Sequence, residues 1–381
     1  MLFTTASSAP SPLYVVYQHN WAFSPTTLTI VFAVYVFGLL ASLLILGGLS
    51  DHVGRRPVLL AAIGVESLSL VLFLIADNVV ALMVARTVQG LATGAAMATA
   101  GATLVDFNPP HAPGRAGVVN SVAPISGLAL GALGTGALVQ FAPAPTHLIY
   151  ALLLGAMTLA ALAVFAAPET SAPRPGAVAS LVPKLGVPPR LRRDLLALLP
   201  ILIASWALGG LYLSLGPSVA ASLFGLTNHF IGGLVVTLLC GTGAVTAFLL
   251  RATQGNRVLA IGSSLLFVGT VVSLVGVETS HVALAAAGTA IAGVGFGAAA
   301  LACFGTLARL ATPTERGRLF ATAYVLAYLA FSIPAVAAGF AATSVGLHPT
   351  TDVYCLVVIA MSLAALFTQR LLHTPASSEA S

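Results

Sequence analysis

The sequence predicts an all-α membrane protein with twelve transmembrane helices in two pseudo-symmetric bundles of six. The first observation is the composition: 58% of the 381 residues are hydrophobic and only 7% are charged, whereas about 25% are charged in a soluble domain. Second, apolar runs of roughly 20 residues recur along the chain, each long enough to cross ~30 Å of hydrocarbon as a helix. Third, the basic residues fall almost entirely in alternate loops.

The apolar runs are continuous and rich in Ala, Leu and Gly, without the ten-residue alternation of a membrane β-barrel, so each is predicted to be a helix. The expected spans are 1–17, 26–49, 58–76, 79–103, 117–140, 147–167, 196–216, 228–250, 258–277, 282–308, 319–343 and 352–369. The Pro-rich, basic segment between the sixth and seventh spans is predicted to be a flexible linker. The expected organisation is an N-terminal six-helix bundle at 1–167, a cytoplasmic linker at 168–195, a C-terminal six-helix bundle at 196–372 and a tail at 373–381.

The basic residues predict how the chain is oriented. Fourteen of the fifteen Lys and Arg residues lie in one alternate set of loops or in the tail, and the fifteenth, Arg86, lies inside a span. Because cytoplasmic loops carry an excess of Lys and Arg, we expect a multi-pass protein of the plasma (cell inner) membrane with both termini cytoplasmic. Asp77, Glu278 and Asp352 are then expected at the outer face.

An internal repeat supports two halves. Gly90 and Gly94 of the fourth span fall on Gly293 and Gly297 of the tenth at an offset of 203 (293 − 90 = 203). Two six-helix repeats are the architecture of many secondary transporters. The seventh span begins near residue 196, so its partner is expected to begin before residue 1. We therefore expect a truncated first helix, from a misplaced start codon or a deletion.

The loop after the second span reads GGLSDHVGRRP at 47–57. Gly47 allows close approach of two helices, Gly54 permits a tight turn, and Asp51 can sit against the positive N-terminal end of a neighbouring helix. A loop that only directs topology would need the arginines but not this Gly and Asp spacing. The loop resembles the signature of the major facilitator superfamily, and its matching positions are Gly47, Leu49, Asp51, Gly54, Arg55 and Arg56. The resemblance implies that Asp51 meets the start of the eleventh span and latches the outward-facing state.

A second pattern of the same superfamily, R-x-x-q-G, is matched in the fourth span by Arg86, Gln89 and Gly90. A charge in hydrocarbon costs ~2.5 kcal/mol or more, so it normally faces a cavity or a partner. The resemblance implies a place at the central cavity and, in antiporters, a role in proton coupling; the alternative is an arginine that clamps backbone carbonyls. Glu66 is the only acidic residue well inside a span and is the candidate proton carrier. Its depth differs from that of Arg86 by ~8 Å, so pairing is allowed but not forced.

Glycines at helical spacing predict close helix packing. The fifth span resembles the antiporter signature g-x-x-x-G-P-x-x-G-G, but Ala132 replaces the proline that kinks that helix. Antiporter function and simple close packing therefore both remain open for this span. The expected helix-packing glycines are Gly94, Gly127, Gly131, Gly134, Gly293 and Gly297.

The resemblance places the first, fourth, seventh and tenth spans around the cavity. Polar and aromatic side chains on these spans are candidate substrate ligands: Tyr14, Tyr17, Gln18, Trp206 and Tyr212. Tyr17 and Gln18 are alternatively anchors at the membrane interface. The few charges favour a neutral or amphipathic substrate.

The single lysine, Lys184, does not follow a glycine, so no phosphate-binding P-loop is present and ATP alone cannot drive the protein. No cluster of acids, His or Cys predicts an enzyme, a metal site or a cofactor, and the positive charge is a topology signal, not a nucleic-acid one. We expect a monomeric secondary transporter in the lipid bilayer that moves a small solute by alternating access, with proton-coupled efflux as the first subtype. The alternatives are a metabolite uniporter or symporter, and a transport-dead membrane sensor.

Overall fold

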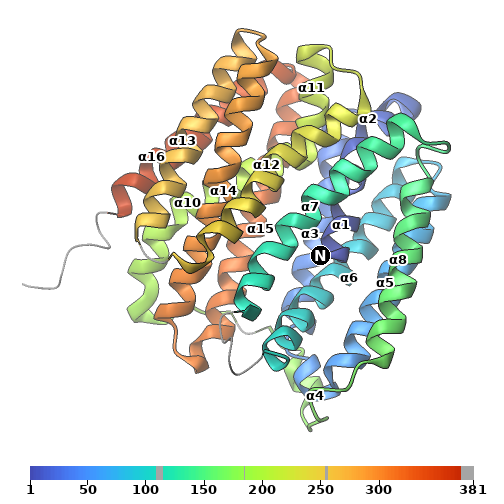
Figure 1. Ribbon diagram of the computed structural model, residues 1–381, viewed down its shortest axis with the longest axis vertical. Helices are drawn as coiled ribbons and strands as arrows, with labels where there is room; N and C mark the ends of the chain where they lie inside the picture. Colours follow the sequence, from blue (N-terminus) through green and yellow to red (C-terminus); the bar gives the residue numbers. More distant parts are fainter. Residues whose placement is uncertain (109–114, 184, 254–255, 370–381) are drawn as a thin grey trace, which may run out of the picture.

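The computed structural model describes residues 1–108, 115–183, 185–253 and 256–369, and these residues form long helices packed side by side (Figure 1). Eleven of the described helices are long and apolar enough to cross a membrane. In the N-terminal half they are α3 (Pro25–Leu46), α5 (Arg55–Ile75), α6 (Val79–Asp106), α7 (Arg115–Phe141) and α8 (Leu148–Ala166). In the C-terminal half they are α10 (Arg192–Ser214), α12 (His229–Leu249), α13 (Asn256–Glu278), α14 (Val282–Leu310), α15 (Pro313–Ser344) and α16 (Leu347–Thr368). The predicted all-α membrane fold is confirmed.

The predicted first span consists of two consecutive helices, α1 (Leu2–Ser8) and α2 (Pro10–Trp21), and it extends beyond the expected end at residue 17. Prolines cause the break. A helical N–H bonds the carbonyl four residues earlier, and proline has no N–H. Pro10 therefore leaves the Ala6 carbonyl, and Pro12 leaves the Ser8 carbonyl, without their helical donors.

Short helices occupy several connections: α4 (Ser50–Val53), α9 (Ala177–Ser180) and α11 (Gly216–Phe224), with the 3₁₀ turns η1 (Pro189–Leu191) and η2 (Leu250–Ala252). The segment predicted as a flexible linker contains α9 and η1, and it is held to both halves. The Arg174 N–H donates to the His52 carbonyl at 2.8 Å, and the Gly186 N–H donates to Thr322 Oγ1 at 3.0 Å. Lys184 and the predicted tail at 373–381 lie outside the described residues.

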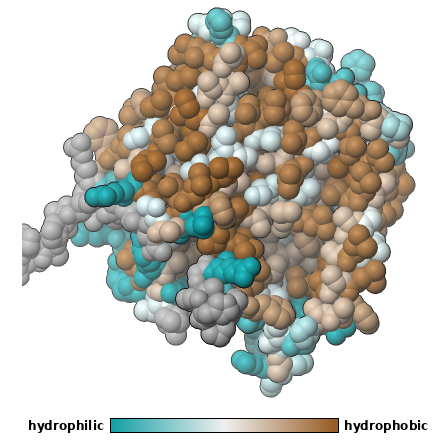
Figure 2. Space-filling model, in the orientation of Figure 1, coloured by the Kyte–Doolittle hydropathy of each residue, from teal (hydrophilic) through white to brown (hydrophobic). Residues whose placement is uncertain are grey.

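The two ends of the bundle differ in charge. At one end of the bundle α3 ends and α5, α7, α10 and α15 begin, and we call this end the Arg-rich face. We call the other end the opposite face. A hydrophobic belt lies between them, with hydrophilic residues gathered toward the ends (Figure 2). In Figure 1 the Arg-rich face carries α4 and the opposite face carries α11.

The largest contacts between the halves are those of α7 with α12 and of α3 with α15. Within the N-terminal half, α3 and α6 approach closely because Gly90 has no side chain: a Cβ there would lie 2.1 Å from the Tyr35 carbonyl oxygen. Most of the predicted packing glycines also lie at backbone-to-backbone approaches: Gly94, Gly127, Gly131, Gly293 and Gly297. Gly134 is an exception, because an added Cβ would meet nothing within 4 Å.

Candidate functional site

Arg86 of α6 is buried in the N-terminal half, with only 1% of its surface exposed. Its Nη1 donates to the Ser7 carbonyl at 2.9 Å and to Gln89 Oε1 at 2.6 Å. The guanidinium also lies over the ring of Tyr35 from α3, 4.3 Å from the ring centroid, where the negative face of the ring attracts the cation. Arg86 therefore both clamps a backbone carbonyl and belongs to a side-chain network.

Gln89 connects Arg86 to the buried acid Glu66. The Gln89 amide nitrogen donates to Glu66 Oε1 at 3.1 Å and to the Ala6 carbonyl at 3.1 Å, while its oxygen accepts from Arg86. Arg86 and Glu66 form no direct ion pair among the described residues. The sequence allowed a contact between Arg86 and Glu66 but did not require one. In the structure the side-chain amide of Gln89 connects the two residues. Glu66, Gln89 and Arg86 are hereafter the polar cluster.

The break in the first span supplies part of this cluster. Because Pro10 has no N–H, the Ala6 carbonyl needs another donor, and Gln89 supplies it. The Ser7 carbonyl, one residue later, accepts from Arg86. The polar cluster thus holds α1 directly, so a change in the cluster acts on the position of the first span.

Three polar atoms at this level are buried and have no hydrogen-bond partner among the described residues: Glu66 Oε2, Arg86 Nε and Tyr14 Oη. An isolated carboxylate in an apolar environment is strongly destabilised, and gaining a proton relieves that cost. A buried acid with one bonded and one unbonded oxygen, next to a permanent cation, can therefore hold or release a proton. Among the three substrate candidates of the first span, Tyr14 has a polar atom without a partner among the described residues, whereas Tyr17 and Gln18 are hydrogen-bonded.

The C-terminal half contributes an aromatic cluster around Trp206 of α10. The ring of Trp206 packs edge-on against Tyr328, Phe331 and Phe304, at centroid distances of 4.8, 5.8 and 6.4 Å. Tyr324 stacks on Phe304 at 4.9 Å. Trp206 Nε1 is buried without a hydrogen-bond partner among the described residues. The cluster therefore combines packed aromatic rings with one buried donor that has no partner among the described residues.

Most of this aromatic cluster was not predicted from the sequence, although the spacing of its residues could have indicated it. Phe320, Tyr324, Tyr328 and Phe331 are spaced by four, four and three residues on α15, which places them on one face of the helix. Tyr35, which covers Arg86, had no comparable signal, because a single tyrosine in an apolar span does not indicate its partner.

The other substrate candidates have partners elsewhere. The Tyr212 hydroxyl bonds to Thr289 Oγ1 at 2.7 Å and Ser273 Oγ at 3.2 Å, so it links α10 to α14 and α13. Tyr17 stacks on Trp21 and bonds to the Tyr150 hydroxyl. Tyr17 and Trp21 also line a pocket of about 260 Å³ that includes Asp77 and His147, near the opposite face.

Gln18 lies between the halves near the opposite face. Its amide nitrogen donates to the Phe23 carbonyl and its oxygen accepts from Ser218 of α11, both at 3.4 Å. Tyr17 is buried and Gln18 contacts both halves. Both interpretations of these residues, as interface anchors or as cavity ligands, therefore stay predictions.

The loop signature forms a charged network at the Arg-rich face. Arg55 pairs with Asp51 and with Asp106 of α6, and its Nη1 also donates to Ser50 Oγ. Gly54 makes the turn with φ of +109°, a conformation that residues with a side chain rarely adopt. Arg56 lies over the ring of Phe165, 4.6 Å from its centroid.

Glu169 caps the first turn of α5, accepting from the N–H groups of Arg55 at 2.7 Å and Arg56 at 2.9 Å. Burial raises the pKa of Glu169, but the N–H groups of Ser171, Arg55, Arg56 and Thr170 outweigh burial, so the pKa is lowered from its usual value. The capping carboxylate therefore stays ionised and compensates the positive end of the helix.

Asp51 pairs with Arg55 of its own loop here, and α4 packs against α5 and α9. Among the described residues, an added Cβ at Gly47 would meet only Leu43 of the same helix within 4 Å, so none of these residues brings a second helix close to it. Leu49 precedes the first turn of α4. The predicted contact between Asp51 and the start of the eleventh span, α15, is not made among the described residues. It stays a prediction for the outward-facing state.

Replacing Asp51 with asparagine is expected to slow transport several-fold without lowering the amount of protein in the membrane. The Asp51 side chain is 57% exposed, and such ion pairs contribute little to stability. A loss of transport would therefore come from the conformation in which Asp51 reaches α15. Transport rate and thermal stability are measured for Asp51→Asn and for the control Asp77→Asn on the opposite face. A wild-type rate in Asp51→Asn contradicts the latch.

The contacts between the halves gather toward the opposite face. Thr26 of α3 bonds to Thr343 Oγ1 and to the Gly339 carbonyl of α15, and the His229 N–H of α12 donates to Gln140 Oε1 of α7. The Thr237 hydroxyl donates to the Ala129 carbonyl at 3.1 Å, nearer mid-depth. At the Arg-rich face, the ion pairs of the described residues are Arg55 with Asp51 and Asp106, and Arg190 with Glu315; none of them joins α3–α8 to α10–α16. The conformation is closed at the opposite face.

Long apolar helices in two joined halves, with a buried polar cluster in one and an aromatic cluster in the other, define a helical membrane transport protein. The family model of the Major Facilitator Superfamily matches residues 1–333, and the chain belongs to this family. The protein is therefore a secondary transporter. Among solved structures, a D-xylose-proton symporter matches with a TM-score of 0.72 at 18% identity, covering 96% of this chain and 94% of the symporter chain. This similarity shows the shared fold.

Proposed function

We propose that the protein moves a small neutral or amphipathic solute by alternating access, coupled to a proton carried by Glu66. The observation that carries the proposal is the polar cluster: a buried acid with a free oxygen, bridged by Gln89 to a permanent cation and to the first span. The proton gradient is then the energy source, and no bound cofactor is required.

The aromatic cluster supports the substrate class. Trp206 and its neighbours offer flat apolar faces and one unused N–H donor. A solute with an apolar body and a hydrogen-bond acceptor would use both features. The described side chains of this cluster carry no charge, so a strongly ionic substrate would lose its hydration without compensation.

Efflux by proton antiport is the proposed direction, and proton symport is the second candidate, favoured by the named symporter of similar fold. Both are tested with purified protein in liposomes that contain a pH-sensitive dye. As each member of a substrate panel enters the lumen, an antiporter makes the lumen more alkaline and a symporter makes it more acidic. A uniporter gives counterflow with no pH change, and an absence of counterflow across a broad panel would favour the sensor.

The proposed orientation places the Arg-rich face in the cytoplasm of a cell with the protein in its inner membrane. Reporter fusions after Arg115, within 168–195, after Arg257 and after Arg370 are expected to report the cytoplasm. Fusions near Asp77, His147 and Glu278 are expected to report the outside. A cytoplasmic signal from any member of the second group contradicts the span count. With this orientation the conformation described above faces inward.

We propose a monomer as the working unit in the bilayer.

A further inference from the structure

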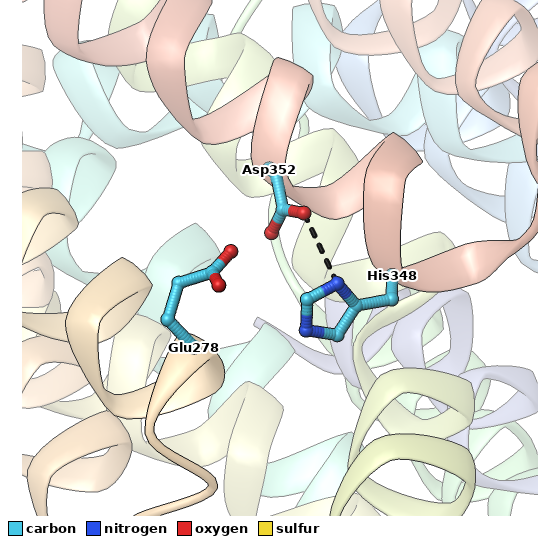
Figure 3. Close-up of side chains that lie close together, drawn as sticks. All are labelled: Glu278, His348 and Asp352. Carbon is cyan, nitrogen blue, oxygen red and sulfur yellow. Dashed lines mark ion pairs between the residues drawn. The ribbon is translucent and has the colours of Figure 1, made fainter.

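Three metal-ligating side chains converge at the opposite face, in the C-terminal half and away from the polar cluster. Glu278 ends α13, while His348 and Asp352 lie near the start of α16. One ligand atom from each of the three lies within 4.8 Å of the others. Figure 3 shows the imidazole and the two carboxylates turned toward one another, with His348 Nδ1 3.1 Å from Asp352 Oδ2.

Helix geometry explains this convergence. His348 and Asp352 are four residues apart, so they share one face of α16. The packing of α13 against α16 adds Glu278. No cluster of metal ligands was visible in the sequence, since Glu278 lies 70 residues before His348 (348 − 278 = 70). The fold brings them together.

A separate observation favours a cation at this group. Asp352 Oδ1 is buried and has no hydrogen-bond partner among the described residues, and Figure 3 shows it on the side of Glu278. Two carboxylates that face one another repel unless a cation or a proton lies between them. The described arginines of the C-terminal half lie at or near the Arg-rich face, and Arg86 lies inside α6 of the other half. Among the described residues, the basic group paired with these carboxylates is the imidazole of His348.

We propose that Glu278, His348 and Asp352 bind one divalent first-row transition metal ion, with Zn²⁺ as the best fit. An imidazole nitrogen with two carboxylate oxygens is a ligand set for Zn²⁺ and its neighbours, whereas Ca²⁺ and Mg²⁺ prefer six or more oxygens. With bonds of ~2.1 Å, tetrahedral ligands lie about 3.4 Å apart. The ligand atoms now lie within 4.8 Å of one another, so the group must contract by up to about 1.4 Å (4.8 − 3.4 = 1.4). Glu278 is exposed and His348 is half-buried, so both can move, and water can fill the fourth position.

The test is Zn²⁺ binding to purified, tag-free full-length protein in detergent, measured by titration calorimetry. We expect one Zn²⁺ per chain at this site, and an increase in thermal stability on binding. Glu278→Gln, His348→Ala and Asp352→Asn are each expected to weaken Zn²⁺ binding about tenfold or more. Glu278→Gln changes an exposed helix end, so it tests the site without disturbing the fold.

The matched control is His281→Ala, which removes an exposed histidine three residues after Glu278 that does not belong to the group. It is expected to keep wild-type affinity. The proposal is overturned if the wild-type protein has no saturable Zn²⁺ site, if the three variants bind as tightly as wild type, or if His281→Ala loses as much as His348→Ala. Equal affinity for Mg²⁺ and Zn²⁺ overturns the metal class. Transport is not needed for this readout, so its outcome is independent of the proposed function.

Discussion

Replacing Glu66 with glutamine is expected to abolish gradient-driven accumulation of substrate while leaving exchange of substrate across the membrane intact. Glutamine has nearly the shape of glutamate and keeps an oxygen that can accept from Gln89, but it cannot carry a proton. Accumulation is measured in liposomes with an imposed pH gradient, and exchange is measured as counterflow without one. Ser69→Ala is the matched control, because Ser69 is also buried on α5 but bonds only to the Ala85 carbonyl.

Arg86→Ala is expected to damage both activities. It removes the donor to the Ser7 carbonyl and to Gln89 Oε1, and each buried acceptor left without its donor costs about 1–3 kcal/mol. If Glu66→Gln still accumulates substrate against a gradient, Glu66 is not the proton carrier. The protein would then be a uniporter or would use another proton route.

A disulfide between Thr26→Cys and Thr343→Cys is expected to stop transport almost completely. The two threonine hydroxyl oxygens are 2.9 Å apart across the halves, so cysteines there can reach disulfide geometry with a small rotation. The bond would hold the opposite face closed and so prevent alternating access. Transport is measured in liposomes after oxidation and again after a reductant, which should restore it.

Each single cysteine variant, oxidised in the same way, is the control for this experiment and is expected to keep transport. The native cysteines Cys240, Cys303 and Cys355 are free and buried, so they should not react. Cross-linked protein that transports at the unmodified rate would show that the contact between Thr26 and Thr343 is not part of the gate.

The helices could be predicted from the sequence because each apolar run has the length that a membrane imposes, and ends at Gly, Pro or charged residues. The first span was the exception. Its hydropathy was readable, but the consequence of Pro10 was not, since it depends on Gln89 lying beside the Ala6 carbonyl. A sequence shows which carbonyl a proline frees, but not which side chain will bond to it.

The candidate site was predictable only where a residue type is unusual for its environment. Arg86 and Glu66 stood out because charges are rare in hydrocarbon, whereas the bridge through Gln89 required the relative heights of α5 and α6. Tyr212 is an opposite case: it lies on a predicted cavity span, but its hydroxyl is satisfied by Ser273 and Thr289. Span membership does not give the direction of a side chain.

The contacts that close the opposite face are electrically neutral. Thr26 meets Thr343 and Gly339, and Gly136 of α7 packs against Gly233 of α12; no ion pair joins the two halves there among the described residues. Salt screens charges over ~10 Å at 0.1 M but leaves hydrogen bonds and close packing nearly unchanged. The lifetime of the closed state should therefore stay constant as the ionic strength of the medium on that side rises or falls.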